Sequence, residues 1–401
     1  MSPSLVVVIL SMLLGIQPVT TDLYLPALPA LTDSLSTTLP QAQLTLSALL
    51  LAFGVSQLFW GPLSDRFGRR PVLLFGLCAY TLASVGSALA ADISAMIVWR
   101  SVQGAAMGAV VMCARAIVRD LYQPADGARV MSKGLSGLGV IACASAPLGG
   151  LLAELLGWRF ALLALTAFGI AALGLIALRF QESVLRKNPL ATQPATVVRV
   201  WGQLFSNPTF LTFSALSAAS YGGLFTFLAS SSFVFIKVLG LSKAHYGLLM
   251  FSMSFFYVVG TFVCRRLLPR FGVRQSVALA AVLSLTGGTA LGVLALLGIQ
   301  NVWAIMVPYC LFMVGHGVHQ PCGQSGAVGP FPAAAGAASA MNGFLMMVVA
   351  FGMGAWLGTH PATSAQPMAY GVWFWSVCIA ATAWTLIQKY GAPARADGAA
   401  P

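Results

Sequence analysis

The chain has 401 residues, of which 58% are hydrophobic and 7% are charged, and its formal net charge is +12. Soluble domains carry about 25% charged residues, so this composition excludes a water-soluble globular protein. Apolar runs of about 18 residues or more recur along the sequence, and each is long enough to cross the hydrocarbon core of a bilayer as a helix.

Read in chain order, the apolar runs are separated by charged or turn-rich breaks and predict an all-α membrane protein with twelve transmembrane helices. The expected helices span 5–29, 41–63, 71–91, 93–118, 130–155, 158–179, 208–236, 243–268, 274–298, 302–325, 333–357 and 367–389. The lipid bilayer is therefore expected to be the solvent of the protein rather than a partner that it visits.

Lys and Arg are distributed unevenly between the loops. If the N-terminus is cytoplasmic, the loops and tail on that side hold Arg66, Arg69, Arg70, Arg119, Arg129, Lys133, Arg179, Arg186, Lys187, Arg199, Arg265, Arg266, Arg270, Arg274, Lys389 and Arg395. The other side holds only Arg159, Lys237 and Lys243. Short basic loops stay in the cytoplasm, so we expect both termini there. The sequence lacks the clustered basic face that would indicate nucleic-acid binding.

The two halves of the chain contain related turns. Asp65-Arg66-Phe67-Gly68-Arg69-Arg70 follows the second expected helix, and Pro269-Arg270-Phe271-Gly272-Val273-Arg274 follows the eighth. Such a turn is also a common way to end a helix at the cytoplasmic side, but the matching positions favour duplicated six-helix bundles. The expected domains are an N-terminal bundle at 1–180, a cytoplasmic linker at 181–207, a C-terminal bundle at 208–390 and a cytoplasmic tail at 391–401.

The segment from Gly61 to Pro71, with the sequence GPLSDRFGRRP, resembles the loop between helices two and three of the major facilitator superfamily. Gly61 would permit close helix approach, and Asp65 would offer a carboxylate to the neighbouring guanidinium groups. We expect a conformational latch built from Gly61, Asp65, Arg66, Gly68, Arg69 and Arg70.

Further motifs together resemble those of Bcr/CflA-type drug:proton antiporters. They are Thr21–Pro29 (TDLYLPALP), Arg100–Gly104 (RSVQG), Ala116–Tyr122 (AIVRDLY), Ala146–Gly150 (APLGG) and Ala335–Ala340 (AGAASA). The resemblance implies the major facilitator fold, with two bundles around a central cavity. It also implies a protein of the bacterial cytoplasmic (inner) membrane that exports small drug-like molecules in exchange for protons, with the proton gradient as energy source. We expect a monomer that uses no cofactor.

The fifth expected helix carries a stripe of small residues. Ala142, Ala146 and Gly150 recur every four residues, and Gly149 lies beside them, so another helix can pack closely here. Pro147 adds a bend. The resemblance associates this element with exchange, and hence with export, whereas a tight helix crossing without directional meaning explains the stripe equally well.

Three charged residues, Asp22, Arg100 and Arg115, fall well within expected helices, where each would cost about 2.5 to 3.5 kcal/mol at a helix centre. We expect Asp22 to bind and release the coupling proton and Arg100 to tune that site, because burial favours a neutral carboxyl group and a guanidinium favours a charged one. The alternative is a helix-ending Asp in an aqueous vestibule. Arg115 would pair with anionic substrate groups or with helix ends.

A drug cavity is expected to have apolar walls and a few polar anchors. The candidates by depth in the membrane are Tyr24, Gln103, Arg115, Tyr221, Phe225, Phe227 and Met346. Aromatic and Met side chains in membrane helices also face lipid or the protein core, so the alternative for each apolar candidate is a packing role.

Several kinds of chemistry have no motif in the sequence. No G-x-x-x-x-G-K-[ST] phosphate loop and no G-x-S-x-G nucleophile motif occurs, so neither ATP hydrolysis nor another enzymatic activity is expected. His316 and His319 lie three residues apart, with Cys322 following, but without a nearby carboxylate we expect packing histidines and no metal site. The alternatives to drug export are transport of one specific metabolite and a membrane-embedded enzyme.

Overall fold

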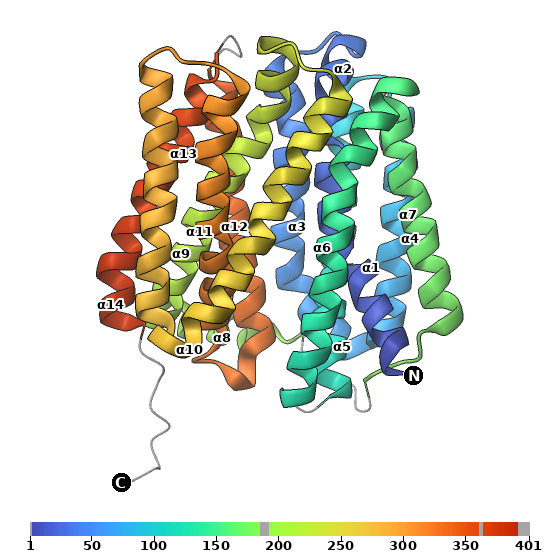
Figure 1. Ribbon diagram of the computed structural model, residues 1–401. Coiled ribbons are helices and arrows are strands. Elements are labelled where there is room, and N and C mark those ends of the chain that lie inside the picture. Colours follow the sequence, from blue (N-terminus) through green and yellow to red (C-terminus); the bar gives the residue numbers. More distant parts are fainter. Residues whose placement is uncertain (1, 123, 185–191, 361–363, 392–401) are drawn as a thin grey trace.

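The structure is a computed structural model that describes residues 2–122, 124–184, 192–360 and 364–391, and in these ranges it contains helices and no strands (Figure 1). Its α-helices are α1 (Pro3–Asp22), α2 (Leu28–Ser34), α3 (Leu39–Phe67), α4 (Arg69–Leu89), α5 (Ile93–Leu121), α6 (Pro124–Leu155), α7 (Trp158–Arg179), α8 (Pro194–Phe205), α9 (Pro208–Ser232), α10 (Lys243–Leu296), α11 (Val302–Val328), α12 (Ala335–Gly358), α13 (Gln366–Ala381) and α14 (Ile387–Tyr390). Short 3-10 turns at Leu25–Ala27 and Pro332–Ala334 and π-helical turns at Phe233–Val238 and Thr382–Leu386 extend or join them. The all-α prediction is confirmed.

Eleven helical segments of the described residues are long and apolar enough to cross a membrane. One of them, α10, has 54 residues and is interrupted at Gly272, whose backbone angles of φ 69° and ψ 178° are not helical. At a rise of about 1.5 Å per residue its length is more than twice the thickness of the hydrocarbon core, so α10 accounts for two of the twelve predicted crossings. The chain is a multi-pass membrane protein.

Two segments differ from the sequence prediction. The first helix was expected to reach residue 29, but α1 ends at Asp22 and a 3-10 turn and α2 follow. Pro26 and Pro29 account for the break, because a proline in a helix interior removes a backbone donor and clashes with the preceding turn. The expected linker contains a helix, α8, whose Val197, Trp201 and Leu204 repeat with helical spacing.

The helices pack in two groups. In the first, α1 packs against α6, α5 contacts α3 and α4, and α7 contacts α4; in the second, α9 packs against α11, α12 and α13, and α10 against α11 and α13. The groups meet where α3 packs on α12 and where α6 packs on α10, the two helices that converge toward the top in front in Figure 1. The interior between these two seams holds the cavities described below.

The paired Arg-Phe-Gly turns have related backbones. Gly68 joins α3 to α4 with φ 106° and ψ 161°, and Gly272 joins the two parts of α10 with φ 69° and ψ 178°. Positive φ favours glycine because a Cβ would clash with the backbone. Both halves therefore need a glycine at the same point of the motif, which supports an internal duplication.

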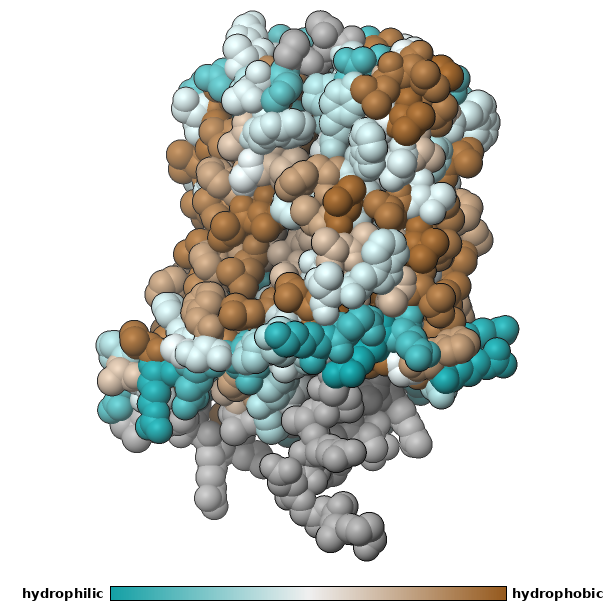
Figure 2. Space-filling view, turned by 90° about the vertical axis from the view of Figure 1, so that its left-hand side faces the viewer, coloured by the Kyte–Doolittle hydropathy of each residue, from teal (hydrophilic) through white to brown (hydrophobic). Residues whose placement is uncertain are grey.

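One end of the bundle carries the N-terminus and α14 (Figure 1), and we call it the termini end; the opposite end, beside α2, is the distal end. Figure 2 shows apolar side chains over the middle of one face and a hydrophilic band toward the termini end. Large apolar side chains such as Phe75 and Val140 are exposed. This surface fits an apolar belt between polar ends, as a bilayer requires.

Candidate functional site

A central cavity of about 240 Å³ lies between the two helix groups. It is lined by Gln17, Pro18, Thr21 and Asp22 of α1, Phe53 and Gln57 of α3, Arg115 of α5, Leu138, Gly139 and Ala142 of α6, Tyr221, Leu224 and Leu228 of α9, Met253, Ser254, Tyr257 and Val258 of α10, Met313, His316, Gln320 and Gln324 of α11, and Ser339, Asn342, Gly343, Met346 and Met347 of α12. Its walls are mainly apolar, with amides, hydroxyls and two opposite charges between them. Both helix groups contribute, so relative movement of the groups would reshape the cavity.

Asp22 is the acidic residue of this lining, and it is the last residue of α1. Its Oδ1 accepts a hydrogen bond from Thr21 Oγ1 at 2.8 Å, and the ion pairs within the described part of the chain do not include it. The helix break after Asp22 exposes this carboxylate to the cavity. A half-buried carboxyl group held by one hydroxyl can bind a proton or a cationic group that enters the cavity.

Arg100 does not line the cavity. Its side chain is fully buried, Nη1 donates to Gln103 Oε1 at 2.6 Å, and Nη2 donates to the carbonyl oxygen of Thr20 at 3.2 Å. The guanidinium carbon lies 4.2 Å from the ring centroid of Tyr24, a cation–π contact. Arg100 therefore holds the backbone of α1 two residues before Asp22, and it does not pair with the Asp22 carboxylate.

Tyr24 and Gln103 belong to the same buried network and not to the cavity lining. Gln103 Nε2 donates to Ser84 Oγ at 2.7 Å, and the Tyr24 hydroxyl lies 2.7 Å from Thr45 Oγ1. Beside them, the hydroxyls of Thr20 and Tyr80 are 2.7 Å apart. Most polar atoms of this network, from α1, Tyr24, α3, α4 and α5, thus have hydrogen-bond partners behind the cavity wall, whereas the buried Arg100 Nε has none among the described residues.

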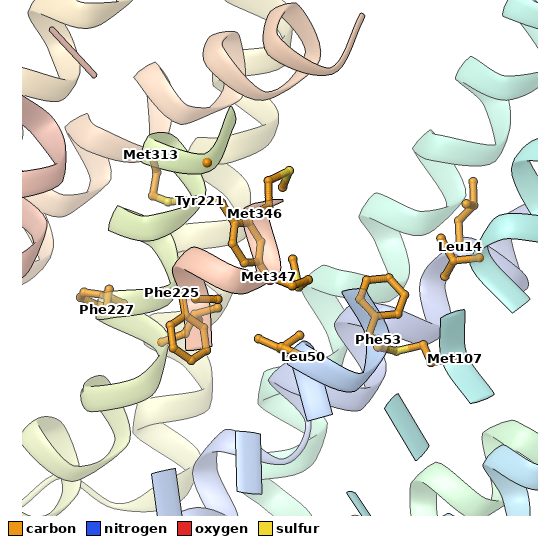
Figure 3. Close-up of a cluster of buried hydrophobic side chains, with 14 of the residues drawn as sticks. Leu14, Leu50, Phe53, Met107, Tyr221, Phe225, Phe227, Met313, Met346 and Met347 are labelled. Atoms are coloured by element: carbon orange, nitrogen blue, oxygen red, sulfur yellow. The ribbon is translucent and has the colours of Figure 1, made fainter. Parts of the chain in front are cut away.

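Tyr221, Met346 and Arg115 line the cavity, whereas Phe225 and Phe227 do not. Figure 3 shows Tyr221 beside Met346, with Phe225 and Phe227 farther along α9. Phe227 instead stacks on Tyr309, with ring centroids 3.6 Å apart and planes 7° from parallel. Phe225 and Phe227 are core residues of the second helix group, as the alternative interpretation of the sequence allowed.

Several cavity residues were not singled out from the sequence. They are the amides Gln17, Gln57, Gln320, Gln324 and Asn342, the aromatic Tyr257, and His316, which the sequence analysis assigned to packing. His316 Nδ1 lies 2.8 Å from Ser220 Oγ, so the ring is both packed and part of the cavity wall. Placing a side-chain amide in an apolar membrane helix costs free energy. The presence of these amides within apolar runs was therefore the sequence signal that could have identified them.

His319 and Cys322 do not line the central cavity. His319 is fully buried, with Nδ1 3.5 Å from Ser284 Oγ, and the Cys322 sulfur lies 3.8 Å from that of Cys264. Among the described residues, no group of three His, Cys, Asp or Glu side chains is placed to hold a metal ion.

The small-residue stripe of the fifth expected helix, now α6, lies at the seam between the helix groups. A Cβ on Gly247 of α10 would be 2.6 Å from the Ala146 carbonyl oxygen and 2.9 Å from Pro147 Cα. A Cβ on Gly149 would be 2.1 Å from the Leu23 carbonyl oxygen, and one on Gly150 would be 2.4 Å from that of Lys243. The backbones of α6 and α10 therefore touch at Gly150 and Gly247 and close the distal end, and Gly149 packs α6 on Leu23 within the first helix group. Ala142, farther from that end, lines the cavity.

The residues expected to form the latch are grouped around one buried guanidinium at the termini end. Arg69 is 3% exposed, and its guanidinium contacts Asp65 at 2.6 Å, Asp120 at 2.9 Å and Ser64 Oγ at 2.5 Å. Ser183 Oγ donates to the same Asp120 at 3.1 Å. The sequence analysis identified Arg69 and Asp65 but missed Asp120, which comes from the end of α5.

Glu182 completes this cluster from the segment after α7. Its two carboxylate oxygens accept the backbone N–H groups of Arg69 and Arg70 at 2.9 and 3.1 Å, where α4 begins. A carboxylate at a helix N-terminus accepts from backbone N–H groups that have no partner within the helix, and it interacts favourably with the positive end of the helix dipole. A Cβ on Gly68 would lie 2.4 Å from Glu182 Oε2, so glycine is needed here for space as well as for backbone conformation.

The remaining latch candidates have other surroundings. Arg66 is exposed and donates to Thr192 Oγ1 at 2.7 Å, and Arg70 donates to the carbonyl oxygen of Ala177 at 3.0 Å. A Cβ on Gly61 would lie 3.7 Å from its nearest neighbour, Met112 Cε. That is an ordinary contact, so the expectation that Gly61 permits unusually close helix approach is wrong.

A second cavity, of about 460 Å³, lies between the helix groups toward the termini end, and we call it the terminal cavity. Asp65, Arg69 and the first turn of α12 line it, and α8 forms another wall. It shares Gln57, Arg115 and Ser339 with the central cavity. The internal space therefore continues from Asp22 toward the termini end, whereas the distal end is closed by helix contacts.

The sequence and the fold both match known proteins. Residues 10–355 match the family model described as the Major Facilitator Superfamily. The chain is 29% identical over 341 residues to "Multidrug resistance protein D" of Escherichia coli, covering 84% of each chain, and 30% identical over 324 residues to "Chloramphenicol resistance protein" of Pseudomonas aeruginosa, covering 80% of this chain and 75% of that one. It is 25% identical over 363 residues to "Bicyclomycin resistance protein homolog" of Haemophilus influenzae, covering 90% of each.

A solved structure of a D-xylose-proton symporter superimposes with a TM-score of 0.74, covering 95% of this chain and 96% of that one. The sequences are 15% identical, so this match concerns the fold alone.

Proposed function

Because the chain belongs to the major facilitator superfamily, we propose that it is a secondary active transporter that exports small amphipathic drug-like compounds in exchange for protons. The observation that carries the proposal is the cavity between the helix groups, in which Asp22 is the acidic residue of a largely apolar lining. Membership of this family makes the protein a transporter, and the membrane-enzyme alternative is not favoured.

The relatives support drugs as substrates. The match to a multidrug resistance protein and to a bicyclomycin resistance protein homolog confirms the resemblance to Bcr/CflA-type antiporters. The relatives named above carry names of antibiotic or multidrug resistance, which favours this proposal over transport of one specific metabolite. Apolar walls with several amides suit varied amphipathic compounds, because shape and burial contribute more to their binding than any single polar contact.

The asymmetry of the contacts supports alternating access. Backbone contacts such as that of Gly247 with Ala146 close the distal end, and the central and terminal cavities join toward the termini end. The excess of Lys and Arg in the loops at the termini end assigns that end to the cytoplasm. In this conformation, therefore, the binding site faces the cytoplasm of a bacterial inner membrane.

Asp22 is assigned to proton coupling. In a cavity that alternately faces two compartments, a carboxyl group can take a proton from one side and release it when a cationic or polar drug competes for it. Arg100 acts on this site as a positioning residue, because it holds the Thr20 carbonyl and packs on Tyr24 at either side of the α1 break. Arg115 supplies the positive charge of the cavity for anionic groups.

The cluster around Arg69 is assigned to the conformational latch. Its ion pairs join α3, α4 and α5, and Asp65 and Arg69 face the first turn of α12 across the terminal cavity. Rocking of one helix group against the other would change the distance between this cluster and the first turn of α12. A division into two bundles joined at 181–207, a monomeric state and dependence on no cofactor beyond the proton gradient complete the proposal.

Transport by purified protein in proteoliposomes tests this function. Internal pH and the uptake of a panel of unrelated drugs, including chloramphenicol, are followed with an imposed proton gradient and without ATP. Drug-dependent proton movement with several members of the panel is the expected result. Drug movement that ignores the gradient would reject proton coupling, and transport restricted to a single compound would favour the metabolite alternative.

A further inference from the structure

An apolar groove of about 360 Å³ lies on the outside of the bundle between α3 and α8. Phe59 and Leu63 of α3 and Val198 of α8 belong to its walls, and Thr192 is its polar residue. Phe59 and Val198 are 57% and 64% exposed, so the groove opens to the surroundings of the protein. Its volume is within the range of about 300–1,000 Å³ that is common for small-molecule sites.

Two arginines fix the depth of this groove in the membrane. Arg66 is exposed and bonds Thr192 at the beginning of the groove, and Arg199 is exposed beside Val198. Arg66 lies in the last turn of α3, and Arg side chains near the ends of membrane helices extend to the headgroup region of a bilayer. The groove therefore opens among the acyl chains just below the headgroups of the leaflet at the termini end.

The groove and the terminal cavity have a common wall. Leu58, Pro62, Val197 and Trp201 line both spaces, so a single layer of side chains separates them. Pro62 lies inside α3 and has no N–H for the Leu58 carbonyl, which weakens the helix at this wall. Trp201 is the bulkiest of the four, and it belongs to α8, a 12-residue helix outside the membrane-spanning set.

From the terminal cavity the path continues to the transport site. Gln57, Arg115 and Ser339 line both the terminal and the central cavity, and Asp22 lies in the latter. The groove, the terminal cavity and the central cavity thus form one series that leads from the lipid to the proton-binding carboxylate. Its outer part is apolar and its inner part is increasingly polar.

We propose that the α3–α8 groove is a side portal through which an uncharged or weakly charged amphipathic substrate, dissolved in the leaflet at the termini end, enters the terminal cavity past Trp201. This inference rests on the proposed function and specifies where that function takes its substrate. An amphipathic compound partitions into the leaflet because its apolar surface leaves water there, so its concentration at the portal exceeds that in the cytoplasm. The polar inner cavities then receive its hydrogen-bonding groups.

Access to the terminal cavity is measured by cysteine labelling, which needs no known substrate. Ala337, which lines the terminal cavity but not the groove, is replaced by Cys in a variant whose seven native cysteines are substituted. The Ala337→Cys protein in vesicles is exposed to N-pyrenylmaleimide, which dissolves in the bilayer, or to a sulfonated methanethiosulfonate, which stays in water. The portal is then filled by the double substitution Leu63→Trp and Val198→Trp.

The filled portal is expected to slow labelling by N-pyrenylmaleimide about tenfold and to leave labelling by the sulfonated reagent unchanged. The matched control is the pair Val140→Trp and Leu178→Trp, which places the same side chains at exposed apolar positions of α6 and α7. Unchanged labelling by N-pyrenylmaleimide, or equal slowing of both reagents, would overturn the proposal.

A second variant keeps the test independent of the folding of the filled protein. Trp201→Ala thins the common wall, and it is expected to speed labelling by N-pyrenylmaleimide several-fold. A groove permanently occupied by a lipid chain would give no acceleration, and that result would also overturn the portal. The labelling rates report access to the terminal cavity and not transport. They would therefore stay the same if the protein proved not to export drugs in exchange for protons, so the side portal and the proposed function can be rejected independently.

Discussion

Arg115 Nη1 donates a hydrogen bond to Ser339 Oγ at 3.1 Å, which joins α5 of the first helix group to α12 of the second. Both residues line the central and the terminal cavity. The bond therefore crosses the path between the two spaces, and it is a contact that movement of the helix groups must break. The same guanidinium is the cation that a substrate in the central cavity meets.

Arg115→Gln is expected to weaken binding of anionic amphipathic compounds about tenfold, because a charge-assisted hydrogen bond contributes roughly 1.5–3 kcal/mol. Binding of cationic compounds should be unchanged or tighter, since Asp22 remains. Ser339→Ala is the control, because it removes the bond between the helix groups and keeps the cation. Equilibrium binding of both classes to detergent-purified protein measures this, and equal losses for both classes would contradict it.

Arg100→Lys keeps a positive charge but cannot bond Gln103 and the Thr20 carbonyl together in the planar geometry of a guanidinium. We expect the rate of proton-coupled transport to fall about tenfold or more, because the α1 break at Asp22 loses its support. Drug affinity should change less than threefold, since Arg100 does not line the cavity. A loss confined to affinity would contradict a positioning role.

Asp120→Asn leaves the buried Arg69 guanidinium with one fewer carboxylate. Truncating a partner of a buried ion pair costs up to about 3–5 kcal/mol, and Asp120 is 15% exposed, so the cost should be at the lower end of that range. The apparent melting temperature in detergent is expected to fall by several degrees. Asp33→Asn is the control, because the Asp33–Lys237 pair is exposed and contributes about 0–1 kcal/mol. Equal shifts for both variants would contradict the assignment.

The sequence predicted the helices well because each signal for a crossing is local. Twenty or so apolar residues specify a span wherever the rest of the chain lies, and the positive-φ glycines of the two Arg-Phe-Gly turns mark their ends. The amphipathic α8 was missed because its 12 residues are shorter than a span and follow a polar segment. The break after Asp22 was missed because the apolar run continues through Pro26 and Pro29 to the end of the expected helix, although a proline interrupts a helix in the turn that precedes it.

The site was less predictable because its members are brought together by packing. Depth along a helix suggested both Tyr221 and Phe227, but only the rotation of α9 decides that Tyr221 faces the cavity and Phe227 faces Tyr309. Asp120 and Glu182 lie 51 and 113 residues from Arg69 in the sequence, so their contacts with Arg69 could not be predicted from local spacing. Asp22 stood out because a carboxylate within an apolar run is costly.

Gly247→Val would place side-chain atoms where the backbone of Ala146 and Pro147 now lies, so the distal end cannot close as described. We expect the central cavity to become accessible from the distal end, with labelling of Ala142→Cys by a water-soluble maleimide from that side several-fold faster. Gly352→Val on α12 is the matched control, because a Cβ there meets no atom within 4 Å. Equal rates in both variants would show that the seam at Gly247 does not govern closure.

The central claim is that Asp22 carries the coupling proton of drug export, and proton movement in proteoliposomes tests it most directly. Asp22→Asn is compared with Asp92→Asn, a carboxylate that caps α5 at the distal end, where Asn caps as well as Asp. The account predicts that drug-dependent proton movement is lost in Asp22→Asn and retained in Asp92→Asn, while drug binding persists in both. Full drug-dependent proton movement in Asp22→Asn would contradict it.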